Sequence, residues 1–527
     1  MLKRKYLFIF ISGILFSVPF IFPQLYILSF FSAIPFFIIL FDEIKNNKKN
    51  KAIKYAFIFG MSFYLPVYIW FLWMYPMEQT GVTPIQSAAI VIAAWLGFPL
   101  LQTFVMLILP LGLKIFRKLY EKNIFLFPIL TACFYVISEW VQSWFMSGLT
   151  WAKLSVSQYK NLYFIQSVSV FGTYFTSFLI IFINSAIAVY ILNKNKKNLL
   201  IFSVILIYFI NSYFGYLRIM YYYNYDEKAG ETKKITAQII QGNISSYEKW
   251  EIAGMENSLK VYKNLLEENI GENIDICVFP ETAIPALVYN EGKLYENLYD
   301  LAKENDITLF TGVIYSSEEN EYNAIMAFNK NYDFIKPYGK RHLVPFGEYL
   351  PANKILKKVF PFISNMTLFD AVLTPGEGPD IMNINDINYG GLVCFDSIFP
   401  ELARKSVKDG ADILIVVTND SWFRDSPAIK QHNAQSVLRA VENNRYVIRS
   451  ANTGISSFIS NTGKILQKSE VDQRTVLTEE IKIIKNKTIY TICGDIILYL
   501  SWIYVAFCII LLIKTNLNLK INRGENL

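Results

Sequence analysis

The chain of 527 residues is 53% hydrophobic and contains 42 Phe and 34 Tyr. Its mean hydropathy of +0.30 excludes an ordinary soluble enzyme of this size. The formal net charge is +7, but Lys and Arg gather in short clusters beside apolar runs, which argues against a nucleic-acid-binding surface. The five cysteines form no CxxC pair and only two histidines are present, so we expect no disulfide framework, no metal site and no cofactor.

Eight apolar runs are long enough to cross a bilayer, for which a helix needs about 20 residues. They lie near residues 6–22, 25–41, 55–75, 87–113, 123–141, 163–192, 199–217 and 496–513. Only Pro23 and Gln24 separate the first two runs, so one long kinked helix is the alternative there. We favour two separate spans.

The distribution of basic residues predicts the orientation of these spans, because short cytoplasmic loops are enriched in Lys and Arg. With eight spans, all of the basic clusters fall on one side; they are Lys3–Lys5, Lys45–Lys54, Lys114–Lys122, Lys194–Lys197 and Lys514–Arg523. A single first span would invert every later loop, so the charges favour two cytoplasmic termini. The basic start could also belong to a signal peptide, but no small-x-small cleavage site follows it, so we predict an uncleaved anchor.

The chain therefore divides into a membrane domain of seven helices at 1–217, an extracytoplasmic globular domain at 218–490, and an eighth helix with a cytoplasmic tail at 491–527. In the globular part, short β-rich runs end in Gly, Pro, Asn or Asp; they are 235–240, 276–279, 308–315, 324–329, 390–393, 413–418 and 446–450. Helical periodicity marks 257–268, 293–305 and 431–443. This alternation predicts a layered α/β domain with a buried sheet.

Three residues with useful chemistry follow predicted strands. Glu281 comes after one strand as a carboxylate suited to proton transfer, and Lys340 follows the flexible Gly339. Taken singly, each has a simpler explanation as a cap or a solvated turn. Cys394 ends the run that begins at Gly390, just before a helix expected near Pro400, and a thiol near a helix N-terminus ionises more readily. A free cysteine is otherwise usually a packing residue.

The ordered set Glu281, Lys340 and Cys394 resembles the Glu-Lys-Cys triad of the nitrilase superfamily. The surrounding motifs resemble one branch, the apolipoprotein N-acyltransferases; they are Gln241–Ile244, Phe279–Thr282, Lys340–Tyr349, Thr418–Phe423 and Asn452–Ile455. The resemblance implies an αββα sandwich domain joined to eight membrane helices. It covers nearly the whole chain.

The resemblance also implies a mechanism. Glu281 would act as general base, Cys394 would take an acyl chain from phospholipid as a thioester, and Lys340 would stabilise the oxyanion. The acceptor would be the α-amino group of the N-terminal diacylglyceryl-cysteine of a lipoprotein. The expected partners are thus phospholipid, apolipoprotein and the bilayer, with no nucleic acid, and a monomer is expected in the bacterial inner membrane.

Four further residues follow from the same resemblance. Glu348 matches a carboxylate expected to orient Lys340, and Trp250 matches a tryptophan near the substrate entrance. Where the family commonly has Cys-Tyr-Glu, this chain has Phe395 and Asp396 after Cys394, which leaves the roles of those two positions open.

Other interpretations use the same residues. A membrane-anchored amidase or hydrolase would use the same triad with water as the acceptor, although eight spans exceed what a tether needs. A Cys-His hydrolase would use His342 or His432, and a noncatalytic scaffold would leave the triad idle. The basic and apolar segment Lys354–Ile363 is a further hypothesis: an arm that dips into the outer leaflet, or else a surface segment packed on the domain.

Overall fold

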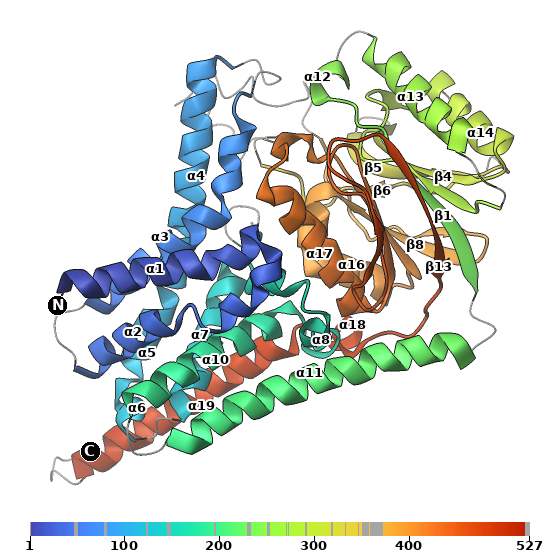
Figure 1. Cartoon of the computed structure of the whole chain (residues 1–527). Helices are drawn as coiled ribbons and strands as arrows, with labels where there is room; N and C mark the ends of the chain where they lie inside the picture. Colours follow the sequence, from blue (N-terminus) through green and yellow to red (C-terminus); the bar gives the residue numbers. More distant parts are fainter. Residues whose placement is uncertain are drawn as a thin grey trace. The chain divides into compact units, whose positions relative to one another are not determined.

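The computed structural model describes residues 2–46, 51–77, 82–122, 125–144, 148, 150–193, 197–228, 233–249, 253–269, 271, 273–289, 292–317, 320–331, 334–345, 347–349, 358 and 373–521. The chain forms two compact units (Figure 1). The first comprises Met1–Ile69, Ala93–Ile219 and Cys493–Leu527, and the second comprises Trp70–Ile92 and Met220–Ile492. The predicted domain boundaries at 217/218 and 490/491 stay predictions.

The first unit is helical. Its α-helices include α1 (Leu2–Ile21), α2 (Ile34–Asn46), α3 (Lys51–Val67), α5 (Ile108–Ile115), α6 (Arg117–Lys122), α7 (Leu126–Gln142), α8 (Leu162–Ile165), α9 (Val168–Phe171), α10 (Thr173–Leu192) and α19 (Ile496–Ile521). α4 (Pro84–Met106) and α11 (Lys197–Lys228) have residues in both units. Short 3-10 helices also occur, η1 (Pro23–Phe30) and η5 (Leu154–Gln158) among them.

Six helical stretches among the described residues are long and apolar enough to cross a membrane: Lys3–Ile21, Pro23–Asn46, Pro84–Ile115, Thr173–Leu192, Leu199–Asn224 and Ile496–Asn516. Two predicted spans correspond to shorter helices. The run at 55–75 forms α3 of 17 residues followed by the 3-10 helix η2 (Ile69–Met74), and the run at 123–141 forms α7, also of 17 residues. The number of eight spans therefore remains a prediction.

The first two predicted spans fold back on each other. Lys5 donates to Asp42 at 2.9 Å, and the hydroxyl of Ser12 donates to the carbonyl of Ser32. These pairings bring the start of α1 to the end of α2. Two antiparallel helices result, and not one long kinked helix.

The second unit contains two sheets. One has the order β13-β1-β2-β4-β5-β6, with β3 paired to β4, and the other has the order β12-β11-β10-β9-β8-β7. The strands are β1 (Lys234–Gln241), β2 (Ile276–Val278), β3 (Leu287–Val288), β4 (Thr308–Ser317), β5 (Asn320–Phe328), β6 (Tyr338–Gly339), β7 (Met382–Ile384), β8 (Ile387–Val393), β9 (Ile413–Thr418), β10 (Tyr446–Ala451), β11 (Ser457–Ile459), β12 (Ile465–Lys468) and β13 (Thr475–Lys482). Parallel pairs lie at the centre of both sheets, β1 with β2 with β4 and β8 with β9 with β10.

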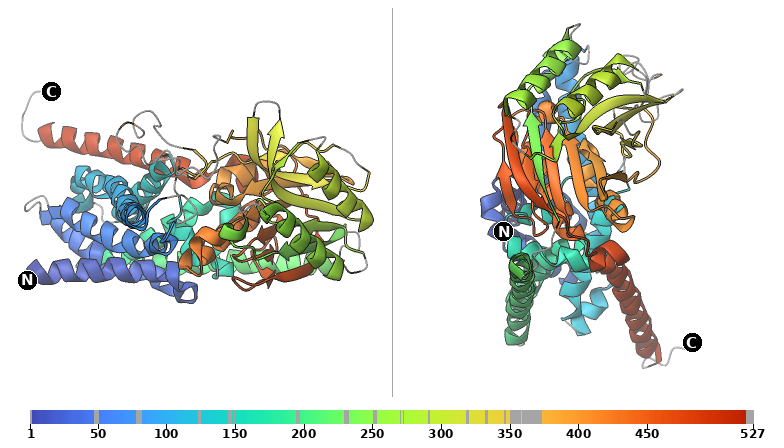
Figure 2. Two further views of the ribbon diagram at one scale, coloured as in Figure 1. Left: turned by 90° about the horizontal axis from the view of Figure 1, so that it is seen from above. Right: turned by 90° about the vertical axis from the view of Figure 1, so that its right-hand side faces the viewer.

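The sheets pack face to face, and helices cover their outer faces (Figure 2). One apolar core joins both sheets and includes Ile239 of β1 and Ile415 of β9. A second core joins the other face of the first sheet to α13 (Gly254–Asn269) and α14 (Lys293–Glu304). The second sheet carries α16 (Pro400–Lys408) and α17 (Pro427–Asn443), and further short helices are α12 (Ser246–Lys249), η7 (Cys394–Ile398), η8 (Asp420–Phe423) and α18 (Ile489–Cys493). The predicted αββα sandwich is confirmed.

Local sequence explains these elements. β9 is buried along its whole length, as a central parallel strand requires, and its six residues are Ile, Leu, Ile, Val, Val and Thr. α17 begins where the Ser426 hydroxyl accepts the amide of Ala428 and Pro427 occupies the first turn, and it ends at Asn444 in a left-handed conformation. All seven predicted strands and all three predicted helices appear, with ends that differ by a few residues.

The segment Trp70–Ile92 belongs to the second unit although it precedes most of the helical unit in sequence. Arg424, directly after η8, donates to the carbonyls of Tyr75 at 2.8 Å and Pro76 at 3.1 Å. The ring of Phe423 meets Trp70 edge to face at 5.1 Å. The turn that follows β9 is therefore held by a segment more than 300 residues away in sequence.

Candidate active site

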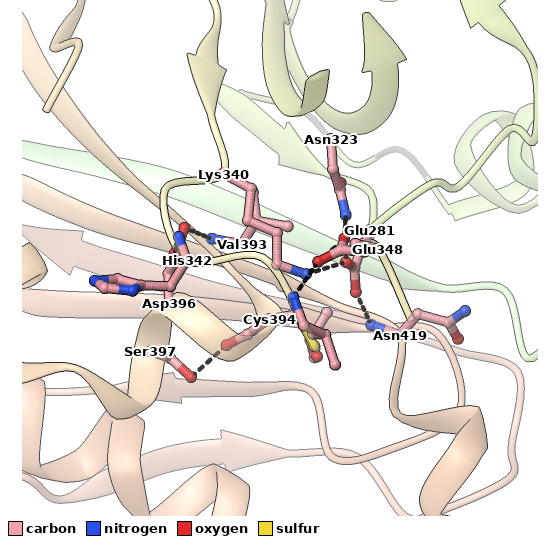
Figure 3. A network of polar contacts seen from close by, with 12 residues as sticks. Glu281, Asn323, Lys340, His342, Glu348, Val393, Cys394, Asp396, Ser397 and Asn419 are labelled. Carbon is pink, nitrogen blue, oxygen red and sulfur yellow. Dashed lines mark hydrogen bonds and ion pairs between the residues drawn. The ribbon is translucent and has the colours of Figure 1, made fainter. Parts of the chain in front are cut away.

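The three candidate residues each stand at the end of a strand in the second unit. Glu281 follows β2, Lys340 follows β6, and Cys394 begins η7 directly after β8. Figure 3 shows the side chains of Glu281, Lys340 and Glu348 in contact, with Cys394 beside them. The two sheets thus bring together residues that are separated by up to 113 positions in the sequence, from Glu281 to Cys394.

The backbone at Glu281 is fixed by a glycine of β4. Gly312 donates to the carbonyl of Pro280 and accepts the amide of Ala283, both at 3.1 Å. A Cβ at Gly312 would come within 2.5 Å of the Glu281 Cα, so only glycine permits this approach. The carboxylate then accepts the backbone amide of Asn419 at 2.7 Å on Oε2.

Lys340 lies between two carboxylates. Its Nζ is 2.9 Å from Glu348 Oε1 and 3.3 Å from Glu281 Oε1, and the side chain is buried. Burial by itself disfavours the charged ammonium, but the carboxylates of Glu348 and Glu281 outweigh it and raise the pKa of Lys340 above its usual range. Lys340 is therefore a permanent cation, suited to stabilising negative charge and unsuited to donating a proton.

Asn323 of β5 completes this cluster, and sequence reasoning missed it. Its side-chain NH2 group donates to Glu281 at 2.8 Å and to Glu348 at 2.7 Å, and its main-chain carbonyl accepts the main-chain amide of Lys340 at 2.7 Å. Glu348 also accepts the amide of Val344 at 2.7 Å. No sequence signal marked Asn323, which directly precedes the predicted run 324–329 and is recognised only once its burial is known.

Cys394 occupies a sharp turn between β8 and η7. Its φ is +47°, in the left-handed region that is uncommon for residues other than glycine. Burial raises the pKa of the Cys394 thiol and the charge of Glu281 adds to the effect, whereas Lys340 acts in the opposite direction. The thiol is thus protonated at rest, and it needs a base before it can act as a nucleophile.

A buried polar network holds the backbone of Cys394. His432 Nε2 donates to the carbonyl of Cys394 at 3.1 Å, and its Nδ1 is 2.8 Å from Asp420. Arg449 donates to the other oxygen of Asp420 at 2.9 Å. Burial alone would raise the pKa of Asp420, but the charges of Arg449 and His432 hold it below its usual range. The Nε2 of His432 therefore bonds to the main chain of Cys394. A Cys-His hydrolase would need that same nitrogen to take the proton of the thiol.

His342, the other histidine, lies on the loop that carries Lys340. Its ring stacks on Phe399 with centroids 4.0 Å apart, and Phe399 also meets Phe395 edge to face at 5.1 Å. Phe395 thus packs among aromatic rings, where the absence of a hydroxyl leaves no polar atom to satisfy.

Asp396 ties the Cys394 turn to the loop that carries Lys340. Its carboxylate accepts the amides of His342 at 2.9 Å and Val393 at 3.2 Å and the phenol of Tyr338 at 3.0 Å. Burial raises the pKa of Asp396 to about 6, although these hydrogen bonds favour the ionised form. The shorter side chain at this position therefore still reaches both segments.

Replacing Asp396 by Asn is expected to remove one pH dependence of folding. The pKa of Asp396 is about 6 in the folded protein and has its ordinary value of 3.8 in the unfolded chain. As the pH rises, the unfolded chain therefore releases this proton first. The parent should accordingly lose stability relative to Asp396→Asn between about pH 4 and pH 6, by up to about 3 kcal/mol at about 1.4 kcal/mol per pH unit. Denaturant unfolding of both proteins across this range measures it, and parallel curves would contradict the expectation.

Two predictions fall outside the described residues. One is Trp250. The other is the arm Lys354–Ile363, of which the structure describes only Lys358, an exposed residue. In the part of the chain that the structure describes, no group of three or more His, Cys, Asp or Glu residues is arranged to hold a metal ion.

Two family models match this chain. Residues 236–485 match the family model described as carbon-nitrogen hydrolase, and residues 12–186 match the apolipoprotein N-acyltransferase N-terminal domain. The apolipoprotein N-acyltransferase of Geobacter metallireducens is 28% identical over 520 residues, covering 96% of this chain and 94% of that protein. That of Haemophilus influenzae is 28% identical over 473 residues, covering 86% and 85%.

Among solved structures, Nit3 of Saccharomyces cerevisiae, from branch 10 of the nitrilase superfamily, is 20% identical and covers 47% of this chain and 90% of its own, with a TM-score of 0.37. This overlap is too low to add to the family matches. The two family matches follow each other in one chain, and the Geobacter relative aligns along almost its whole length. The chain therefore belongs to the apolipoprotein N-acyltransferase family.

Proposed function

We propose that this enzyme transfers a fatty acyl chain from a phospholipid to the α-amino group of the N-terminal diacylglyceryl-cysteine of a lipoprotein, through a thioester on Cys394. The observation that carries the proposal is the buried cluster of Glu281, Lys340 and Glu348 beside Cys394, a thiol whose pKa is raised by burial. This cluster belongs to a membrane protein with six apolar helices of spanning length among its described residues. An acyl donor that is a membrane lipid suits such a chain better than a water-soluble acyl donor.

In the first half-reaction, Glu281 takes the proton of the Cys394 thiol and the thiolate attacks the ester carbonyl carbon of the phospholipid. The oxygen that becomes negative is stabilised by the Lys340 ammonium, a role in which one positioned donor commonly contributes about 3 to 4 kcal/mol. Collapse breaks the ester bond, and the leaving hydroxyl takes the proton back from Glu281. The products are a thioester on Cys394 and a lysophospholipid.

In the second half-reaction, the lipoprotein amine attacks the thioester carbonyl and gives its proton to Glu281. Lys340 again faces the oxyanion, collapse breaks the C–S bond and releases the amide, and the Cys394 thiolate takes the proton from Glu281. The lysophospholipid leaves before the amine binds, so turnover is ping-pong. Glu348 and Asn323 hold Lys340 and Glu281 in register throughout, which avoids reorganisation during the reaction.

The finer location is part of the same proposal. The enzyme lies in the bacterial inner membrane with eight spans, the 218–490 domain on the periplasmic side and both termini in the cytoplasm, because the basic clusters then share one side. It acts as a monomer and binds no nucleic acid.

Phospholipid labelled in one acyl chain tests the function. Incubation of the membrane-embedded enzyme should leave a hydroxylamine-sensitive label on Cys394, and a diacylglyceryl-cysteine peptide added next should receive that label as an amide. Cys394→Ala should take up no label, whereas Cys277→Ala, which alters a buried cysteine of β2, should label normally. Release of the label only as free fatty acid would favour the hydrolase, and no label on folded protein would exclude the thioester mechanism.

The Cys-His alternative makes a different prediction for the histidines. His342→Gln is expected to keep thioester formation within about threefold of the parent, because no proton transfer passes through its stacked ring. The same labelling assay measures this variant beside Cys394→Ala. A loss at His342→Gln as complete as at Cys394→Ala would assign the base to histidine and overturn the role of Glu281.

A further inference from the structure

A second buried cation lies beside the candidate base. Lys249 ends α12, its side chain is 1% exposed, and its Nζ donates to the main-chain carbonyl of Glu281 at 3.2 Å. Lys249 directly precedes Trp250, which the sequence singles out, but no sequence pattern distinguishes Lys249 itself from the exposed lysines of the same domain. The fold alone brings it to Glu281.

Burying an ammonium group is costly unless its charge is compensated. Burial lowers the pKa of Lys249 to about 8, and the carboxylate of Glu281 acts in the opposite direction. The negative charge of Glu281 therefore helps to keep the buried Lys249 charged, because an opposite charge nearby favours the ionised form of an ammonium group.

The charges around Glu281 show why a second cation is useful. Among the described residues, Lys340, Cys394 and Lys249 each interact electrostatically with Glu281, and Glu348 shares the Lys340 ammonium with it. Lys340 is shared between two carboxylates, so the cluster without Lys249 carries one excess negative charge. That excess would favour protonation of a carboxylate, and a protonated Glu281 accepts no proton from the thiol.

The backbone at Glu281 also needs support. Thr282, the next residue, has φ of +43°, which is a strained conformation for a β-branched side chain. Gly312 holds the carbonyl of Pro280 and the amide of Ala283 on either side, while Lys249 holds the carbonyl of Glu281 itself. The contact therefore acts on the residue whose carboxylate must meet the thiol.

We propose that Lys249 is a positioning residue for the general base: it anchors the main chain at Glu281, and its charge keeps that carboxylate ionised and ready to accept the Cys394 proton. The inference rests on the proposed thioester mechanism. It adds a residue from α12 to a site otherwise built from strand ends.

The pH dependence of thioester formation tests it. Single-turnover labelling of Cys394 from acyl-labelled phospholipid is measured between pH 5 and 9 in the full-length enzyme. Lys249→Met removes the cation at similar length, so the acidic limb of the rate profile should move to higher pH by about one unit. Lys249→Arg keeps the charge and should leave that limb near the parent. Lys260→Met, at an exposed lysine of α13, is the matched control and should match the parent throughout.

An acidic limb that does not move in Lys249→Met, whether or not the rate falls, would overturn the proposal, because a structural role lowers the rate at every pH alike. Should Lys249→Met not fold, Lys249→Gln is measured in the same way with the same criterion. The unmodified enzyme distinguishes a failure of the proposed function from a failure of the role of Lys249. A parent that forms no thioester refutes the proposed function, whereas a normal parent with an unmoved variant refutes only the role of Lys249.

Discussion

Replacing Glu281 by Gln is expected to slow thioester formation at Cys394 by about 10² to 10⁴-fold, the usual contribution of a positioned general base. Gln has the same size and keeps an oxygen for the amide of Asn419, which lies 2.7 Å from the carboxylate. It accepts no proton at neutral pH. Because burial raises the pKa of the Cys394 thiol, the thiol depends on that acceptor for ionisation.

The measurement is single-turnover labelling of Cys394 from acyl-labelled phospholipid. Glu256→Gln, at an exposed position of α13, is the matched control and is expected to label like the parent. The NH2 group of Gln then faces the donors of Asn323 and Lys340, so the variant should lose some stability, and thermal unfolding establishes that it is still folded. A labelling rate within tenfold of the parent would remove Glu281 from the role of base.

Lys340→Met is expected to affect both folding and chemistry. The variant removes the cation between Glu281 and Glu348, whose side chains are only 8% and 7% exposed, and breaking a buried ion pair by removing one partner commonly costs about 3 to 5 kcal/mol. It also removes the oxyanion donor, which should lower the rate of acyl transfer by about 10² to 10³-fold. Thermal unfolding and single-turnover labelling measure the two effects separately.

A double variant separates the two roles of Lys340. Adding Glu348→Gln to Lys340→Met removes one of the two facing charges, so most of the lost stability should return. The acylation rate should stay low, because the oxyanion still has no cation. Recovery of the rate together with the stability would mean that Lys340 acts only by balancing charge.

Much of the fold follows from periodicity in the sequence. β9 was predictable because a strand buried on both faces is a continuous apolar run, and α14 because its apolar residues repeat at helical spacing. β12 and β13 were not predicted, since most of their residues are only partly buried or exposed and carry no clear alternation. In the helical unit, apolar length located α3 and α7, but each is 17 residues long, so length alone leaves their spanning open.

The candidate site divides in the same way. Glu281, Lys340 and Cys394 could be singled out because each follows a predicted strand within a recognisable motif. Asn323 could not, because its role depends on the antiparallel register of β5 and β6, which sets it beside the backbone of Lys340. Lys249 could not either, because nothing in its neighbourhood marks it as buried.

Sequence by itself determined the class of this protein: apolar runs for a membrane, alternating patterns for an α/β sandwich, and a base, a cation and a thiol in the order of one enzyme family. Only the tertiary structure decided how those groups are supported. It placed His432 under the carbonyl of Cys394, joined Arg424 to Tyr75, and brought Lys249 to Glu281. The physical reason is that periodicity reports which face of an element is buried, whereas hydrogen bonds and ion pairs between distant residues depend on sheet register and packing.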